Sequence, residues 1–202
     1  MKRLLVALPL MMTSMAAWAT PFVGTYDVTV NTSAPGLIVD ATPDSGNLLF
    51  DLDVGESVWE FLFTISTHED WVNDDDRHPV SASIDFQFTS PQSFGGTSYG
   101  DTEGISIWGG LIQAGVLTWD NGGKNTLYFG NGGILDIYLN DAVFGLGLVG
   151  LSDHSAEVAG KFTYRRSPLA VPEPAILALL GGGLLVLAYI RRRSKAASRR
   201  ED

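Results

Sequence analysis

The chain has 202 residues, no cysteine and a formal net charge of −10 at pH 7. The absence of cysteine excludes disulfide bonds, thiolate zinc sites and cysteine-based catalysis within this chain. Residues 20–170 contain twenty acidic and five basic residues, so this part alone carries a charge of about −15. Such a surface repels nucleic acid, which leaves divalent cations or neutral polymers as better-suited partners.

The N-terminus has the layout of a secretory signal peptide. Lys2 and Arg3 form a charged start, the stretch from Leu4 to Ala16 is apolar, and Ala17-Trp18-Ala19 has small residues around the cleavage position. We therefore predict a signal peptide over residues 1–19, removed by signal peptidase after Ala19. An uncleaved anchor is the alternative, but the apolar stretch is short for a membrane-spanning helix.

Residues 20–166 are predicted to form one all-β ectodomain. The stretch Val80–Phe88 alternates apolar and polar residues, and the even-numbered residues of 156–164 form one apolar or small face, as in half-buried strands. No stretch shows the 3.6-residue stripe of a helix. The other predicted strands are Tyr26–Val30, Leu48–Leu52, Val58–Ile65, Ile105–Trp108, Val116–Trp119, Leu127–Phe129, Ile134–Leu139 and Ala142–Leu148. This strand content predicts a single antiparallel β-sandwich or jelly roll.

Glycine-containing turns separate these strands. Gly95-Gly96 is predicted to be a turn, and Asn121-Gly122-Gly123 and Asn131-Gly132-Gly133 lie on either side of the short strand Leu127–Phe129. Their ten-residue spacing predicts a meander of short antiparallel strands. Residues 167–171 are predicted to be a linker after the ectodomain.

The densest polar segment, residues 68–78, is a candidate calcium site. Asp74, Asp75 and Asp76 supply the hard oxygen ligands that Ca²⁺ prefers. The segment is not an EF-hand loop, because glycine and glutamate are missing at the required positions. The alternative interpretation is a solvated acidic loop between two strands. His68 and His78 lie in the same segment, but a transition metal would need a third ligand that the sequence does not place. We therefore predict no cofactor other than calcium at this segment.

Four tryptophans of the ectodomain raise the question of glycan binding, because exposed indoles form platforms for sugar rings. Trp59, Trp108 and Trp119 lie within strand patterns and are expected in the core. Trp71 lies in the acidic segment and is the one expected to be exposed. We therefore take Trp71 as the candidate glycan contact.

The segment Gly96–Gly100 matches the Gly-x-Ser-x-Gly pattern of α/β-hydrolases. That pattern acts as a nucleophile elbow only between a strand and a helix, with an acid and a histidine later in the chain. Here another strand pattern follows, so we interpret the segment as a loop. The sequence predicts no catalytic residue and no enzyme.

The C-terminus combines a short motif, an apolar segment and a basic end. Pro172-Glu173-Pro174 precedes sixteen uncharged residues, 175–190, and Arg191, Arg192 and Arg193 follow directly. The apolar segment predicts one transmembrane helix, which would need snorkelling flanks or local thinning of the bilayer to span it. Basic residues mark the cytoplasmic side, so the ectodomain is expected outside and the tail inside.

These C-terminal residues resemble the PEP-CTERM sorting signal of Gram-negative bacteria. The resemblance covers residues 172–202 and depends on Pro172, Glu173, Pro174, the apolar span and Arg191–Arg193. It implies recognition by a membrane-embedded exosortase in species that make exopolysaccharide. The prolines remove backbone donors and keep the segment before the span extended, which leaves it accessible to a processing enzyme.

These observations leave several functions open. The first is an exported, non-enzymatic envelope or extracellular-matrix protein that is processed at its C-terminus. Its role would be structural or an interaction linked to exopolysaccharide. The second is a carbohydrate- or calcium-binding module with the same signal. The third is a membrane protein that keeps its C-terminal anchor without processing. A hydrolase is disfavoured, because no nucleophile, base and acid can be assembled from the motifs.

Overall fold

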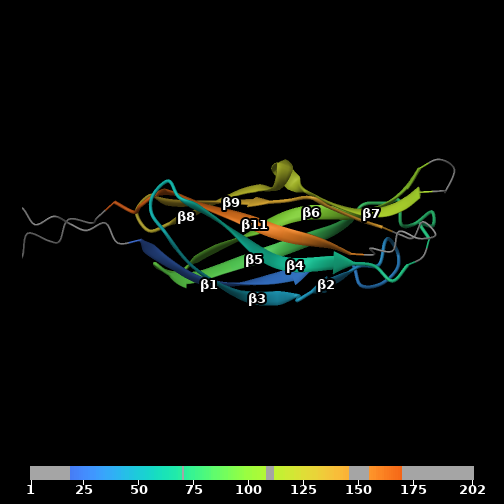
Figure 1. The fold of residues 1–202 in the computed structure, drawn as a ribbon, viewed down its shortest axis with the longest axis horizontal. Coiled ribbons are helices and arrows are strands. Elements are labelled where there is room, and N and C mark those ends of the chain that lie inside the picture. Colours follow the sequence, from blue (N-terminus) through green and yellow to red (C-terminus); the bar gives the residue numbers. More distant parts are fainter. Residues whose placement is uncertain (1–18, 70, 108–111, 146–154, 170–202) are drawn as a thin grey trace, which may run out of the picture. The chain divides into compact units, whose positions relative to one another are not determined.

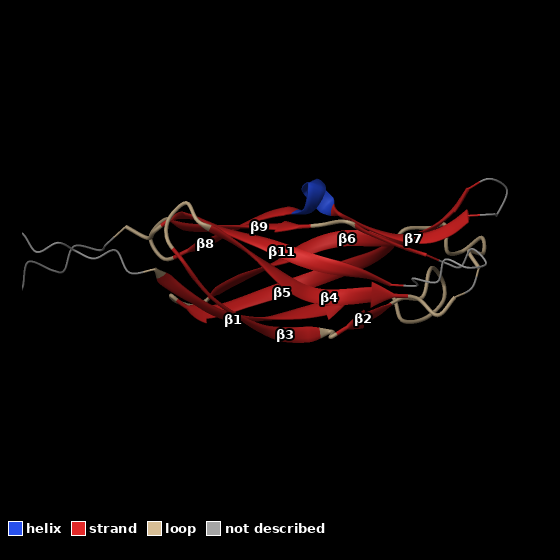
Figure 2. Cartoon of the chain, viewed as in Figure 1, coloured by secondary structure: helices blue, strands red, loops and turns tan. Residues whose placement is uncertain are grey.

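The computed structural model describes residues 19–69, 71–107, 112–145 and 155–169. The chain separates into two compact units, Met1–Pro168 and Leu169–Asp202, and all the strands lie in the first. Within the described ranges there are eleven strands and one short 3₁₀ turn but no α-helix (Figures 1 and 2). The predicted all-β class is therefore confirmed.

The strands form two antiparallel sheets (Figure 1). Sheet A has six strands in the order β10-β7-β6-β5-β1-β3, and sheet B has five in the order β2-β4-β11-β9-β8. The strands of sheet A are β1 (Thr20–Thr29), β3 (Ser45–Leu52), β5 (Val80–Ser90), β6 (Phe94–Ile107), β7 (Ile112–Trp119) and β10 (Ala142–Gly145). Those of sheet B are β2 (Asp40–Thr42), β4 (Ser57–Ser66), β8 (Lys124–Phe129), β9 (Gly133–Leu139) and β11 (Ser155–Arg166).

Consecutive strands are neighbours in only two places. Strands β5, β6 and β7 form a meander in sheet A, and β8 and β9 form a hairpin in sheet B. The hairpin was expected from Asn131-Gly132-Gly133. The other Asn-Gly-Gly segment lies in the 3₁₀ turn η1 (Asp120–Gly123), which joins β7 of sheet A to β8 of sheet B. The prediction of one continuous meander across both turns was therefore wrong.

All ten predicted strands overlap an observed strand. The three-residue strand β2 was not predicted. Strand β6 was predicted only from Ile105, whereas it begins at Phe94 and contains Gly95, Gly96 and the whole segment up to Gly100. The turn at Gly95-Gly96 and the loop over Gly96–Gly100 were therefore wrong predictions. These glycines pair with β5, and a Cβ on Gly95 would lie 2.3 Å from the carbonyl oxygen of Phe86.

One hydrophobic cluster takes side chains from both sheets. Its centre is aromatic: Phe22 of β1 stacks on Phe50 of β3 with 5.6 Å between the ring centroids, and it meets the edge of Tyr164 of β11 at 5.1 Å. Trp119 is buried in this cluster, as expected. In most strands alternate residues therefore point into the core, and the residues between them form the outer faces of the sheets.

The chain termini belong to segments that the structure does not describe. Among the described residues, no helix is long and apolar enough to cross a membrane. The predicted signal peptide, apart from Ala19, and the predicted span 175–190 lie outside the described residues.

Candidate ligand-binding face

The outer face of sheet B carries a groove of about 560 Å³, which we call the sheet B groove. Outward-facing side chains of four neighbouring strands contribute most of it, because side chains of a strand point to opposite faces of the sheet. Its lining residues are Trp59 from β4, Lys161, Thr163 and Arg165 from β11, Asp136, Ile137 and Tyr138 from β9, and Lys124, Asn125 and Thr126 from β8.

Two aromatic side chains rise from this groove. Trp59 is 54 % exposed and Tyr138 is 39 % exposed, and their rings meet edge to face with 6.0 Å between centroids. The expectation that Trp59 lies in the core was therefore wrong. The residues Val58–Ile65 form an almost continuous apolar run, and such a run does not reveal which residues face outward.

The polar floor of the groove is held by hydrogen bonds between strands. The carboxylate of Asp136 accepts from the Thr126 hydroxyl at 2.8 Å and pairs with the Arg165 guanidinium at 3.1 Å. The hydroxyls of Ser57 and Thr163 lie 2.8 Å apart. Because these bonds fix the polar side chains in the free protein, a ligand would meet a prearranged surface at a lower entropic cost.

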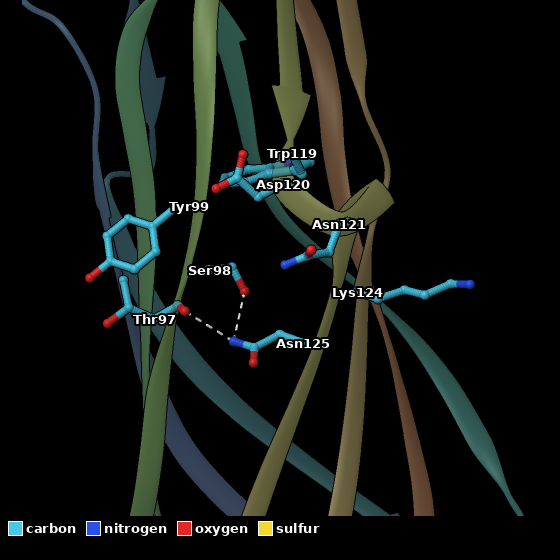
Figure 3. A pocket seen from close by; sticks show the side chains of 9 residues that line it. Thr97, Ser98, Tyr99, Trp119, Asp120, Asn121, Lys124 and Asn125 are labelled. Atoms are coloured by element: carbon cyan, nitrogen blue, oxygen red, sulfur yellow. Dashed lines mark hydrogen bonds between the residues drawn. The ribbon is translucent and has the colours of Figure 1, made fainter.

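A second, smaller pocket of about 80 Å³ lies where β6 approaches β8 (Figure 3). Asn125 donates hydrogen bonds to the carbonyl oxygen of Thr97 and to the hydroxyl of Ser98, both at 3.1 Å. Ser98 is the serine of the Gly-x-Ser-x-Gly segment and lies in the middle of an antiparallel strand. The arrangement lacks the strand–helix turn that exposes a nucleophilic serine. Lys124 points away from Ser98 in Figure 3.

The acidic segment follows β4 and does not gather its three aspartates at one point. Asp74 is fully exposed and pairs with Arg77 at 3.8 Å, whereas Asp75 accepts from the backbone of Gly36 at 3.3 Å. Asp76 is 0 % exposed. Within the described ranges, no group of three or more histidine or acidic side chains is arranged to hold a metal ion.

The buried part of this segment contains two carboxylate oxygens that have no hydrogen-bond partner among the described residues. One carboxylate oxygen of Asp76 accepts from the backbone of Asn73 at 2.7 Å, while the other is buried without a hydrogen-bond partner. A carboxylate oxygen of Glu69 is in the same condition. Burial, and then the negative charge of Asp76, raises the pKa of Glu69. A hydrogen bond from the backbone of Ile38 opposes this shift only in part, so the Glu69 carboxyl lies in a place that disfavours its charged form.

The remaining predicted site residues fall in different parts of the chain. Trp71 is 72 % exposed in the acidic segment, as expected, but it lies outside the lining of the sheet B groove. Ala19 is exposed directly before β1. Ala17 and the sorting residues Pro172, Glu173, Pro174, Arg191, Arg192 and Arg193 lie outside the described residues, as does Trp108.

The described residues thus define an all-β protein with an aromatic and polar groove on the outer face of one sheet. Residues 170–193 match the family model of the PEP-CTERM protein-sorting motif, which confirms the resemblance predicted from the sequence. The motif implies an exported protein that an exosortase-like enzyme processes and that is directed to the cell envelope or surface. No curated protein and no solved structure matches the chain.

Proposed function

We propose that this chain is a non-enzymatic envelope or extracellular-matrix protein with an interaction role linked to exopolysaccharide. The sorting motif over residues 170–193 is the observation that carries the proposal. In this scheme, signal peptidase cleaves after Ala19 and residues 175–190 form a single membrane span with the ectodomain outside. An exosortase-like enzyme then removes the C-terminus, and the ectodomain remains at the cell surface or outside the cell.

We further propose that residues 20–166 form a single sandwich of the β-sandwich or jelly-roll class. The hydrophobic cluster shared by the two sheets supports this assignment. Residues 167–171 then act as a linker between this ectodomain and the sorting signal. The ectodomain needs no disulfide for its stability, because a chain of about 150 residues buries enough apolar surface on folding.

The mass of the mature protein tests the sorting proposal. In a strain with an exosortase, we expect an N-terminus at Thr20 and the loss of the residues that follow the Pro-Glu-Pro motif. Replacing Pro172, Glu173 and Pro174 with alanine should leave the chain intact to Asp202, because the enzyme no longer recognises it. Intact wild-type protein ending at Asp202 in that strain would identify an unprocessed membrane anchor instead.

Carbohydrate binding is the interaction that the sheet B groove supports. Trp59 and Tyr138 present exposed aromatic surface beside hydroxyl, carboxylate and ammonium groups. Ligand sites typically combine apolar and aromatic walls with a few fixed polar groups in this way. Trp71, the contact expected from the sequence, is a single exposed ring in a loop and is a weaker candidate than the pair on the sheet.

Calcium binding is a second candidate function, and its proposed ligands differ from those expected. The unpartnered, buried oxygens of Glu69 and Asp76 favour a cation there, because a buried carboxylate oxygen is costly without a partner. Asp74 is solvated and paired with Arg77, so we do not include it. Backbone oxygens and water would complete the six to eight ligands that Ca²⁺ takes.

Thermal unfolding with and without Ca²⁺ tests this candidate. With a dissociation constant of about 10⁻⁴ M, a calcium concentration of about 10 mM stabilises the folded protein by roughly 2.7 kcal/mol. We expect an increase in melting temperature of several degrees for the wild type and none for Asp76→Asn. The matched control Asp74→Asn should respond like the wild type. An equal response of all three proteins, or none, contradicts calcium binding at Glu69 and Asp76.

A further inference from the structure

The basic residues of the ectodomain are concentrated at one place. Among residues 20–170, twenty acids face only five bases. Lys124, Lys161 and Arg165 line the sheet B groove, whereas Arg77 pairs with Asp74 in the acidic segment and Arg166 lies outside the lining. Three of the five bases thus converge on a single surface of a strongly acidic domain.

The pairing of the strands arranges four groove residues in one line. Lys161 of β11 is the register partner of Trp59 on β4 and also of Tyr138 on β9, and Tyr138 is the partner of Lys124 on β8. Aromatic and cationic side chains therefore alternate across four adjacent strands. With a strand spacing of about 4.8 Å, this aromatic–lysine row extends about 14 Å.

The two lysines of the row have no ionic partner in the part of the chain that the structure describes. Arg165 differs from them, because its guanidinium is already bound by Asp136 at 3.1 Å. The ion pairs of the described residues are His68–Asp40, Arg77–Asp74 and Arg165–Asp136, and neither Lys124 nor Lys161 takes part in one. Their ammonium groups are thus available to an external anion.

We propose that the aromatic–lysine row binds a polysaccharide whose sugars carry carboxylates. Trp59 and Tyr138 would stack on sugar rings, while Lys161 and Lys124 would pair with the carboxylates of neighbouring units. This inference rests on the proposed carbohydrate function and names its ligand class. A domain charge of about −15 repels polyanions elsewhere, so electrostatic complementarity confines such a ligand to this row. It revises the expectation of neutral polymers that the net charge alone suggested.

Binding to three named polymers tests the proposal. The full chain, purified in detergent, is titrated with polygalacturonate, with neutral dextran and with dextran sulfate. We expect polygalacturonate to bind most tightly, and the affinity to fall as salt is raised from about 50 mM to 500 mM, because ions screen charges near the surface. Trp59→Ala and the double variant Lys124→Ala/Lys161→Ala should each weaken binding about tenfold or more, as for central contacts of an interface.

Two variants outside the groove serve as matched controls. Tyr128→Ala removes a 71 % exposed aromatic ring from the same sheet, and Arg77→Ala removes a cation from the acidic segment. Neither residue lines the groove, so both variants should bind polygalacturonate like the wild type. All four variants should show the wild-type circular dichroism spectrum, since each change is made on exposed or partly exposed side chains.

Several outcomes overturn the inference. Equal affinity for dextran would mean that the groove recognises sugar rings without charge, which leaves the proposed carbohydrate function intact. Tighter binding of dextran sulfate would mean that the lysines recognise anionic charge in general. Binding of no polymer would remove the carbohydrate function too, while the mass of the mature chain would still test sorting. A dimer that Trp59→Ala dissociates would identify the row as a contact between copies of this chain.

Discussion

Replacing Phe22 with alanine is expected to lower the free energy of unfolding by about 3–5 kcal/mol, the usual cost of deleting a buried aromatic ring. Phe22 is fully buried in β1 of sheet A. Its ring stacks on Phe50 and meets the edge of Phe129 on β8 at 5.9 Å and that of Tyr164 on β11 at 5.1 Å. The ring thus contacts residues of both sheets, and its removal leaves a cavity in the cluster that they share.

Urea unfolding of the protein, followed by a spectroscopic signal of the ectodomain, measures this loss of stability. A domain of this size has a stability of about 5–15 kcal/mol, so the variant should lose a large fraction of it. Tyr128→Ala is the matched control, since its exposed ring should change stability by no more than about 0.5 kcal/mol. A loss below about 1 kcal/mol for Phe22→Ala would show that the two sheets do not depend on this aromatic centre.

The strands were predictable where the local pattern was strict. Val80–Phe88 alternates over nine residues and lies within β5, and the alternation over 156–164 lies within β11. The same alternation in β11 puts Lys161, Thr163 and Arg165 on the face opposite to the core. Three of the ten residues that line the sheet B groove were thus implicit in the same alternation that places the core residues of β11.

The prediction failed where glycine has two roles. Gly95 was interpreted as a turn residue because glycine often interrupts strands. In the structure it allows β6 to approach the backbone of Phe86, where a Cβ would lie 2.3 Å from the carbonyl oxygen. A close approach between strands and a turn use the same residue type, and only the partner strand distinguishes them.

The groove itself could not be predicted, because its row depends on strand order. Lys124 and Tyr138 lie in one hairpin, but Trp59 and Lys161 join them only because β4, β11, β9 and β8 are neighbours in that order. No local pattern encodes such an order. The acidic segment shows a similar limit: three consecutive aspartates look alike in sequence, yet Asp76 is buried whereas Asp74 is fully solvated.

Gly123→Ala is expected to lower the free energy of unfolding by about 2–5 kcal/mol, because it combines two costs. Gly123 ends the turn η1 with a φ of +74°, a conformation that costs an alanine about 1–2 kcal/mol. A Cβ there would also lie 2.0 Å from the carbonyl oxygen of Leu139. Resolving that overlap by shifting the backbone should cost a further 1–3 kcal/mol, roughly the price of overpacking a core.

Gly122→Ala separates the two costs. Gly122 has a similar φ of +62°, but an added Cβ there would meet nothing within 4 Å. That variant should therefore lose only the backbone part, about 1–2 kcal/mol. Equal losses of stability in the two variants would mean that the Leu139 carbonyl yields freely.

Lys124 follows Gly123 directly and ends the aromatic–lysine row, so Gly123→Ala should also weaken polygalacturonate binding, whereas Gly122→Ala should not. Equal polygalacturonate binding by the two variants would mean that the turn does not fix the position of Lys124.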